Sequence, residues 1–309
     1  MSMPLEIEPP RLQRLTASYL DQRDIRLSVL RLDEINPLVF GNKWFKLKYN
    51  LLASQEQGVS RLLSFGGAYS NHLMAVAAAG QYCGLETIGV VRGELVQPLN
   101  PVLQFAADRG MNLQGISRSQ YRQKDSPEFL EALRSRWGEC YLIPEGGSNA
   151  LGVKGCREIA RLVSWEPGAR QRLLAMACGT GATMAGVIQG FAANVAIRLE
   201  ILGVSVLKAP GYLSANVSHW LEAGKLTTEP SWRIDDDSHF GGYARSNSVL
   251  ERFMSVFSEA HGILLEPVYT GKLFWRLDQD IRSGRIAPGT DIIALHTGGY
   301  IPVAGGLTR

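Results

Sequence analysis

The chain has 309 residues, the usual length of about two domains. Lysine and arginine number 32 and aspartate and glutamate 29, so the net charge of +3 is too small to indicate a nucleic-acid or membrane-surface partner. With 45% hydrophobic and 20% charged residues, the composition excludes a disordered chain. No apolar run nears the roughly 18 residues that span a bilayer, and the first residues do not resemble a signal peptide.

Cysteine and histidine usage gives no sign of a disulfide framework or a metal centre. The four cysteines are widely spaced and none forms a CxxC pair, which favours a reducing, cytoplasmic compartment and disfavours a zinc ribbon. The histidines include no HExxH motif or other closely paired ligands. We therefore expect no metal ion.

Short apolar runs alternate with helix-like segments along the chain. Strands are predicted at residues 25–30, 61–65, 87–91, 140–143, 172–177, 199–206 and 291–295. Helices are predicted between them, at residues 71–83, 127–137, 152–164 and 183–194. This alternation predicts an α/β fold with mostly parallel sheets, in which ligands bind at the carboxyl ends of strands. The proline- and glycine-rich segment 144–148 is the expected crossing point between two lobes.

The first segment that could carry chemistry spans residues 41–48 and contains Lys43, Lys46 and Lys48. These three lysines could simply line a solvent-exposed helix face. Alternatively, one buried lysine beside Asn42 would have a lowered pKa and could form a Schiff base with a carbonyl cofactor. Spacing alone does not choose between the two possibilities.

Two glycine-rich turns each follow a predicted strand and precede a predicted helix. In the turn at residues 66–72, Ser70 or Asn71 could be an ordinary N-cap, or the free N–H groups could bind a carboxylate. The turn at residues 179–183 forms an anion cradle suited to phosphate, with a tight turn without a ligand as the alternative. Its spacing is neither G-x-G-x-x-G nor a Walker A motif, which favours a mononucleotide or a single phosphate over a dinucleotide.

Five motifs occur in a fixed order: Gly-Asn-Lys at 41–43, Gly-Gly-x-x-Ser-Asn at 66–71, Gly-Thr-Gly at 179–181, Pro-Val-Tyr-x-Gly-Lys at 267–272 and His-Thr-Gly-Gly at 296–299. From about residue 33 to 299, the chain thereby resembles the D-cysteine desulfhydrase and 1-aminocyclopropane-1-carboxylate deaminase family. The resemblance implies pyridoxal 5'-phosphate as cofactor and a tryptophan-synthase-β-like, type II fold. Two open, twisted, mostly parallel sheets flanked by helices are then expected, with the cofactor in a cleft between a large domain (residues 1–45 plus 151–309) and a small one (46–150).

The resemblance also assigns the residues that would hold the cofactor. Lys43 matches the lysine that forms the Schiff base and acts as base at Cα, and the resemblance, not the spacing, selects it over Lys46 and Lys48. Thr297 falls where a residue meets the pyridine nitrogen. The phosphate loop of the family matches Gly179, Thr180, Gly181, Ala182 and Thr183.

On the substrate side, the resemblance points to two segments of the chain. Ser70 matches the serine that meets the substrate carboxylate, Asn71 lies beside the cofactor hydroxyl, and His72 follows them. Tyr243 and Tyr269 match two tyrosines that face the substrate, although a buried, hydrogen-bonded aromatic of the core is the alternative for each.

Within the family, a few positions separate the activities. Thr270 and Thr297 are similar to the desulfhydrases, where the deaminases have glutamate and leucine, and His72 is also on the desulfhydrase side. Residues 40, 45–46 and 92–100 match neither pattern. The resemblance thus implies a lyase that converts D-cysteine to pyruvate, sulfide and ammonia. The alternatives are a 1-aminocyclopropane-1-carboxylate deaminase, another small amino acid deaminase or racemase, and, from another class, a non-catalytic cofactor-binding protein.

The same resemblance sets the expected partners. The chain is expected to bind a small amino acid as substrate and neither nucleic acid nor membrane. By analogy with the family, it is expected to form a homodimer.

Overall fold

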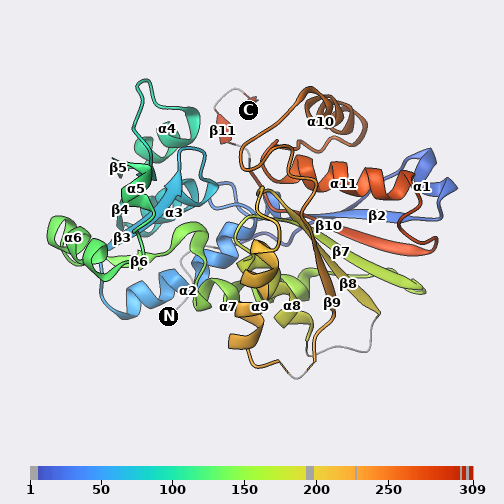
Figure 1. The fold of residues 1–309 in the computed structure, drawn as a ribbon, viewed down its shortest axis with the longest axis horizontal. Coiled ribbons are helices and arrows are strands. Elements are labelled where there is room, and N and C mark those ends of the chain that lie inside the picture. Colours follow the sequence, from blue (N-terminus) through green and yellow to red (C-terminus); the bar gives the residue numbers. More distant parts are fainter. Residues whose placement is uncertain (1–5, 193–197, 227, 300, 304–305, 309) are drawn as a thin grey trace.

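Two open β-sheets form the framework of the chain (Figure 1). The computed structural model describes residues 6–192, 198–226, 228–299, 301–303 and 306–308. The larger sheet has the strand order β1-β2-β10-β7-β8-β9, and all its neighbours pair in parallel except β1 with β2. Its strands are β1 (Leu12–Arg14), β2 (Arg26–Arg31), β7 (Gln171–Cys178), β8 (Leu199–Ser205), β9 (Ser231–Asp235) and β10 (Thr290–His296).

The smaller sheet has four parallel strands in the order β5-β4-β3-β6. One continuous stretch of chain supplies them, whereas the larger sheet combines strands from before and after that stretch. The strands are β3 (Arg61–Gly67), β4 (Glu86–Arg92), β5 (Met111–Ile116) and β6 (Tyr141–Ile143). A separate antiparallel pair, β11 (Ile301–Val303) and β12 (Gly306–Thr308), lies near the C-terminus.

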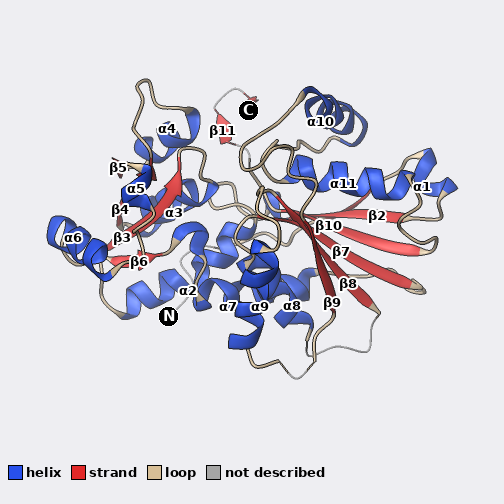
Figure 2. Cartoon of the chain, viewed as in Figure 1, coloured by secondary structure: helices blue, strands red, loops and turns tan. Residues whose placement is uncertain are grey.

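Helices cover both faces of the larger sheet (Figure 2) because its strands are apolar on both faces. Along β7, Leu174 and Met176 belong to one buried cluster, and Leu173 and Ala175 to another, as the two-residue period of a strand requires. The first cluster also contains buried side chains of α2, α3 and α8, so it joins the two sheets. The second contains buried side chains of α10 and α11.

The α-helices are α1 (Ser18–Gln22), α2 (Asn42–Glu56), α3 (Asn71–Cys83), α4 (Pro101–Asp108), α5 (Arg118–Tyr121), α6 (Pro127–Trp137), α7 (Ala150–Cys156), α8 (Ala182–Phe191), α9 (Tyr212–Ala223), α10 (Ser248–His261) and α11 (Thr270–Arg282). Short 3-10 helices occupy Leu32–Glu34, Glu145–Gly147 and Arg157–Leu162. None of the helices in the described part of the chain is long and apolar enough to cross a membrane.

The α/β architecture with two mostly parallel sheets confirms the prediction from the sequence. All seven predicted strands are present, and α3 and α6 coincide with the predicted helices 71–83 and 127–137. The single helix predicted at 152–164 is wrong, because α7 starts earlier, at Ala150, and the chain tightens into a 3-10 helix after Cys156. Helix α8 ends at Phe191, and the predicted end at residue 194 lies outside the described residues. The proposed division into domains stays a prediction.

Candidate active site

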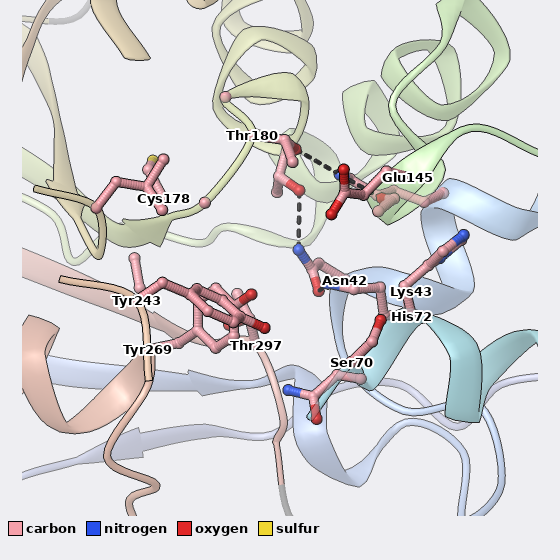
Figure 3. Close-up of a pocket in the computed structure, with 18 of the residues that line it drawn as sticks. Asn42, Lys43, Ser70, His72, Glu145, Cys178, Thr180, Tyr243, Tyr269 and Thr297 are labelled. Carbon is pink, nitrogen blue, oxygen red and sulfur yellow. Dashed lines mark hydrogen bonds between the residues drawn. The ribbon is translucent and has the colours of Figure 1, made fainter. Parts of the chain in front are cut away.

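A pocket of about 250 Å³ lies where the carboxyl ends of strands from both sheets meet (Figure 3). Strands β3, β7 and β10 end beside it, each followed by a turn that the sequence singled out. Every residue assigned from the resemblance lines this pocket except Ala182, which is buried at the first position of α8. Segments far apart in the sequence thus converge on one cavity.

Helix α2 brings Lys43 into the pocket, and Gly41 fixes where that helix begins. Gly41 has a φ of 66°, a left-handed conformation that favours glycine. A Cβ at this position would lie 1.9 Å from the carbonyl oxygen of Thr297. Only glycine therefore allows the start of α2 to pack against the end of β10.

The amine of Lys43 is hydrogen-bonded to Asn42, and its pKa is lowered. Lys43 Nζ donates to Asn42 Oδ1 at 2.8 Å, and Asn42 Nδ2 donates to Thr183 Oγ1 at 2.8 Å. Burial, with the charge of Lys46 as a smaller cause, lowers the pKa of Lys43 to about 7. The amine is therefore about half neutral near pH 7, as a nucleophile or a base requires.

Lys46 is a site residue that the sequence analysis left as one of three lysines. Its side chain is 3% exposed, and Nζ donates to Gly146 O at 2.8 Å and, at 3.3 Å each, to Ser148 Oγ and Thr180 Oγ1. These partners are all neutral, and no carboxylate among the described residues pairs with Lys46. Burial lowers its pKa. A buried cation among neutral acceptors fits a pocket that receives an anion.

The glycine turn after β7 presents N–H groups to the pocket. Gly181 is the N-cap of α8, with a φ of 80° and no side chain capping the helix, so the first N–H groups of α8 lack intrahelical acceptors. A Cβ on Gly179 would lie 3.1 Å from Tyr269 Cε1, so a side chain at Gly179 would crowd that ring. Uncapped N–H groups and the nearby Lys46 are the features that an anion cradle requires, and anion binding at this turn stays a prediction.

Ser70 is the N-cap of α3, which is one of the two roles that the sequence analysis considered for this turn. Its Oγ accepts the N–H of Leu73 at 3.2 Å, which leaves the hydroxyl proton available to the pocket. A Cβ on Gly66 would lie 2.4 Å from Ser70 Oγ, so glycine lets the turn fold back. The capping role is compatible with carboxylate binding, because Ser70 and Asn71 both line the pocket at a helix N-terminus.

His72 is held in one tautomer by the smaller sheet. Ser64 Oγ donates to Ile143 O at 2.8 Å, so at the 2.9 Å contact between Ser64 Oγ and His72 Nε2 the imidazole must be the donor. Burial, with the charges of Lys43 and Lys46, lowers the pKa of His72 well below its usual range. The ring is therefore neutral, and its buried Nδ1 has no partner among the described residues.

Tyr243 and Tyr269 form the wall opposite Ser70, with hydroxyl ends that point toward Asn42 and Ser70 (Figure 3). Their rings pack edge to face, with the ring centroids 6.2 Å apart. Burial raises the pKa of both hydroxyls, that of Tyr269 well above 10. Lys272 Nζ donates to the carbonyl of residue 242 at 2.8 Å, which ties the loop that carries Tyr243 to α11.

The two threonines that resemble the desulfhydrases lie in different places. Thr297 lines the pocket. Thr270 is fully buried outside it, where its Oγ1 accepts the N–H of Glu266 at 2.9 Å. The carboxylate of Glu266 accepts the N–H groups of Val268, Tyr269 and Thr270 at 2.6 to 2.7 Å. Glu266 therefore shapes the turn that places Tyr269, a role signalled in the sequence only by an acid just before a helix.

Two charged residues at the rim were also not anticipated as site residues. Arg92 ends β4, Glu145 begins a 3-10 helix, and both line the pocket. Lys124 Nζ lies 3.7 Å from Glu145 Oε2. Nothing in the local sequence marks these two residues, because their position depends on how the strands of the smaller sheet align.

Comparison with known proteins gives a consistent result. The sequence pattern of the family described as "Pyridoxal-phosphate dependent enzyme" matches residues 9–298. A 1-aminocyclopropane-1-carboxylate deaminase of Burkholderia ambifaria is 28% identical over 96% of this chain and 92% of the relative. The bifunctional D-cysteine desulfhydrase/1-aminocyclopropane-1-carboxylate deaminase of Arabidopsis thaliana is 28% identical over 84% of this chain and 69% of the relative.

Among solved structures, the fold is similar to that of a protein described as "the ACC deaminase homologue". The TM-score is 0.80 at 24% identity, and the match covers 95% of this chain and 91% of the other. At this level of identity the comparison shows a shared fold.

Proposed function

The chain belongs to the family of pyridoxal-phosphate dependent enzymes, and on this premise we propose that it is a lyase acting on a small amino acid. The proposed reaction is that of a D-cysteine desulfhydrase, in which D-cysteine and water give pyruvate, sulfide and ammonia. The observation that carries the proposal is the amine of Lys43, whose pKa is lowered to about 7 and which Asn42 links to the glycine turn at α8. An amine at a fixed separation from an anion cradle suits a cofactor with an aldehyde and a phosphate.

The residues of the pocket fit pyridoxal phosphate. The partly neutral amine of Lys43 can react with the aldehyde, while the turn at residues 179–183 and the unpaired cation of Lys46 can hold the phosphate. Thr297 would face the pyridine nitrogen and Asn71 the ring hydroxyl. When bound, the cofactor supplies an electron sink for the charge left at Cα.

The chain's own residues then bind the substrate and move its protons. Ser70 and the N-terminus of α3 would bind the substrate carboxylate, and the neutral imidazole of His72 would line the substrate side of the pocket without adding a charge. Lys43 would remove the Cα proton, because a base works best when its pKa lies near the working pH. Tyr269 stays protonated at neutral pH, so its hydroxyl can donate to the leaving sulfur, and Tyr243 lies beside it in the same wall of the pocket.

Position 297 supports elimination over transamination. A threonine hydroxyl is neutral and cannot stabilise a protonated pyridine by charge, as a carboxylate would. The charge formed at Cα is then held less strongly on the cofactor, which favours prompt loss of a β-leaving group. Deamination of 1-aminocyclopropane-1-carboxylate is the second candidate, because the relatives with 28% identity bear that name.

We also propose a cytoplasmic homodimer. The family resemblance supports the dimer, and the four free cysteines are in keeping with a reducing compartment. Sedimentation velocity of the purified holoenzyme tests the dimer, and a single species of about monomer mass would contradict it.

A substrate panel tests the proposed reaction. The holoenzyme is assayed with D-cysteine, L-cysteine and 1-aminocyclopropane-1-carboxylate, and sulfide, pyruvate, 2-oxobutyrate and ammonia are quantified. We expect sulfide and pyruvate in equal amounts from D-cysteine, and no product from the Lys43→Ala variant. Exclusive formation of 2-oxobutyrate would favour the deaminase, and no turnover of any amino acid would contradict the lyase.

A further inference from the structure

The pocket carries one cation that the proposed reaction does not use. Arg92 is the last residue of β4 and pairs in register with Gly67, the last residue of β3. Its guanidinium lies next to Gly67, since a Cβ added to Gly67 would be 3.5 Å from Arg92 Nη2. The strand register thus places Arg92 at the carboxyl edge of the sheet, just outside the turn that leads to Ser70.

Arg92 differs from the other charged side chains near this rim because it has no ion-pair partner within the described part of the chain. The ammonium of Lys124 lies 3.0 Å from Asp125 Oδ2 and 3.7 Å from Glu145 Oε2, so it is shared between two carboxylates. Arg92 forms no ion pair with any residue that the structure describes, and the aromatic ring of Tyr121 lies 5.7 Å from its Cζ. Burial raises the pKa of Tyr121 and of Tyr243, so both hydroxyls are neutral. Arg92 therefore lines the pocket without a carboxylate partner among the described residues.

We propose that Arg92 selects amino acids whose β-leaving group already carries a negative charge in the substrate, such as a phosphate or a sulfate monoester. This inference rests on the proposed lyase function and names its substrate class. The Cα–H bond and the bond from Cβ to the leaving oxygen break, and water hydrolyses the released enamine. For O-phosphoserine the balance is substrate plus water to pyruvate, ammonia and phosphate.

The geometry assigns Arg92 to the leaving group rather than to the α-carboxylate. The α-carboxylate has its own donors in Ser70 and the N-terminus of α3, inside the pocket. Arg92 is exposed at the carboxyl edge of the smaller sheet, with its Cζ 5.7 Å from the ring centroid of Tyr121. A planar guanidinium binds phosphate or sulfate oxygens through two parallel hydrogen bonds. An anionic group extending from Cβ toward this edge would meet it.

The test compares an anionic with a neutral leaving group on the same enzyme. The kcat/KM values of O-phosphoserine and β-chloroalanine, each as both enantiomers, are measured for the holoenzyme and for Arg92→Gln, Arg92→Lys and the control Arg136→Gln. Arg136 is an exposed arginine on α6 that does not line the pocket, so its variant removes the same charge elsewhere. Binding of O-phosphoserine and of serine is measured in parallel by titration calorimetry.

We expect the ratio of kcat/KM for O-phosphoserine over β-chloroalanine to fall about ten- to hundredfold in Arg92→Gln, less in Arg92→Lys, and not in Arg136→Gln. An unchanged ratio in Arg92→Gln would overturn the inference. If neither compound is turned over, the lyase proposal fails while the calorimetric preference for O-phosphoserine over serine still tests Arg92. Equal affinities, or a preference that Arg92→Gln keeps, would then overturn the inference.

Discussion

The side-chain amine of Lys43 lies 2.8 Å from Oδ1 of Asn42, the residue that precedes it in α2. The nitrogen of the same amide donates to Thr183 Oγ1 at 2.8 Å, across 141 positions of sequence. One side chain therefore connects the amine to the helix whose N-terminus forms the anion cradle. The connection fixes the distance that a cofactor must span between its two attachments.

A carboxylate in place of this amide should raise the pKa of Lys43. The Asn42→Asp variant puts a negative charge beside the amine and stabilises its protonated form. The pH dependence of Lys43 acylation is measured in cofactor-free protein by peptide mass spectrometry. The pH of half-maximal labelling should lie near 7 in the natural chain and about 1 pH unit or more higher in the variant. Asn42→Ala serves as the comparison without a charge. Identical profiles for Asn42→Asp and the natural chain would show that the amine is not where the hydrogen bond places it.

Removal of the buried cation of Lys46 should weaken phosphate binding specifically. The Lys46→Met variant should lose about tenfold or more in affinity for pyridoxal phosphate, because a charge-assisted hydrogen bond to phosphate is lost. Pyridoxal, which has no phosphate, should lose much less. Lys48→Met is the matched control, since Lys48 pairs with Glu158 at 2.7 Å outside the pocket. Equal losses for pyridoxal and pyridoxal phosphate, measured by absorption titration, would argue for a purely structural role of Lys46.

The close approach of Gly41 to β10 can be tested by a pair of glycine substitutions. Gly41 and Gly84 both have a positive φ, 66° and 67°, but ψ is −153° at Gly41 and 28° at Gly84, so only Gly84 has the left-handed helical backbone that alanine can adopt at a modest cost. A Cβ on Gly84 meets nothing within 4 Å, whereas one on Gly41 would collide with Thr297 O. Gly84→Ala should lower the free energy of unfolding only by the strain of a left-handed alanine, about 1–2 kcal/mol. Gly41→Ala should lower it by at least about 2 kcal/mol more. Urea unfolding measures both, and equal costs would contradict this packing.

Loss of the Tyr269 hydroxyl should slow the reaction without weakening substrate binding. Because burial keeps the pKa of this hydroxyl well above 10, it remains a proton donor throughout the neutral range. Tyr269→Phe should lower kcat by about 10²- to 10⁴-fold with little change in KM. Steady-state kinetics with D-cysteine measures this, with Phe253→Leu on α10, away from the pocket, as a control for general packing. An unchanged kcat would leave Tyr269 as a core aromatic.

Part of this site follows from the sequence for clear physical reasons. Glycines after apolar runs predicted the turns at the ends of β3 and β7, because only such turns bring free N–H groups to a helix start. Spacing could not distinguish Lys43 from Lys46, since residues three apart share a helix face, and both line the pocket. The family resemblance was needed to select Lys43.

Other parts of the site depend on tertiary structure alone. Arg92 reaches the pocket only because β4 aligns with β3 so that it pairs with Gly67, and strand register is not written in a local pattern. The tautomer of His72 depends on Ser64 and on a carbonyl of β6, which lie on two different strands. The prediction of one α-helix at 152–164 is wrong because no helix-breaking residue in the sequence marks the change to a 3-10 helix after Cys156.

We propose that the amine of Lys43 bonds to the cofactor while the turn at residues 179–183 holds the phosphate. Borohydride reduction of the yellow holoenzyme, followed by proteolysis and mass spectrometry, tests this most directly. We expect loss of the visible absorption and a pyridoxyl group on the peptide that contains Lys43, with Lys46 unmodified. A pyridoxyl group on Lys46 or on any other lysine, or no covalent adduct, would contradict it.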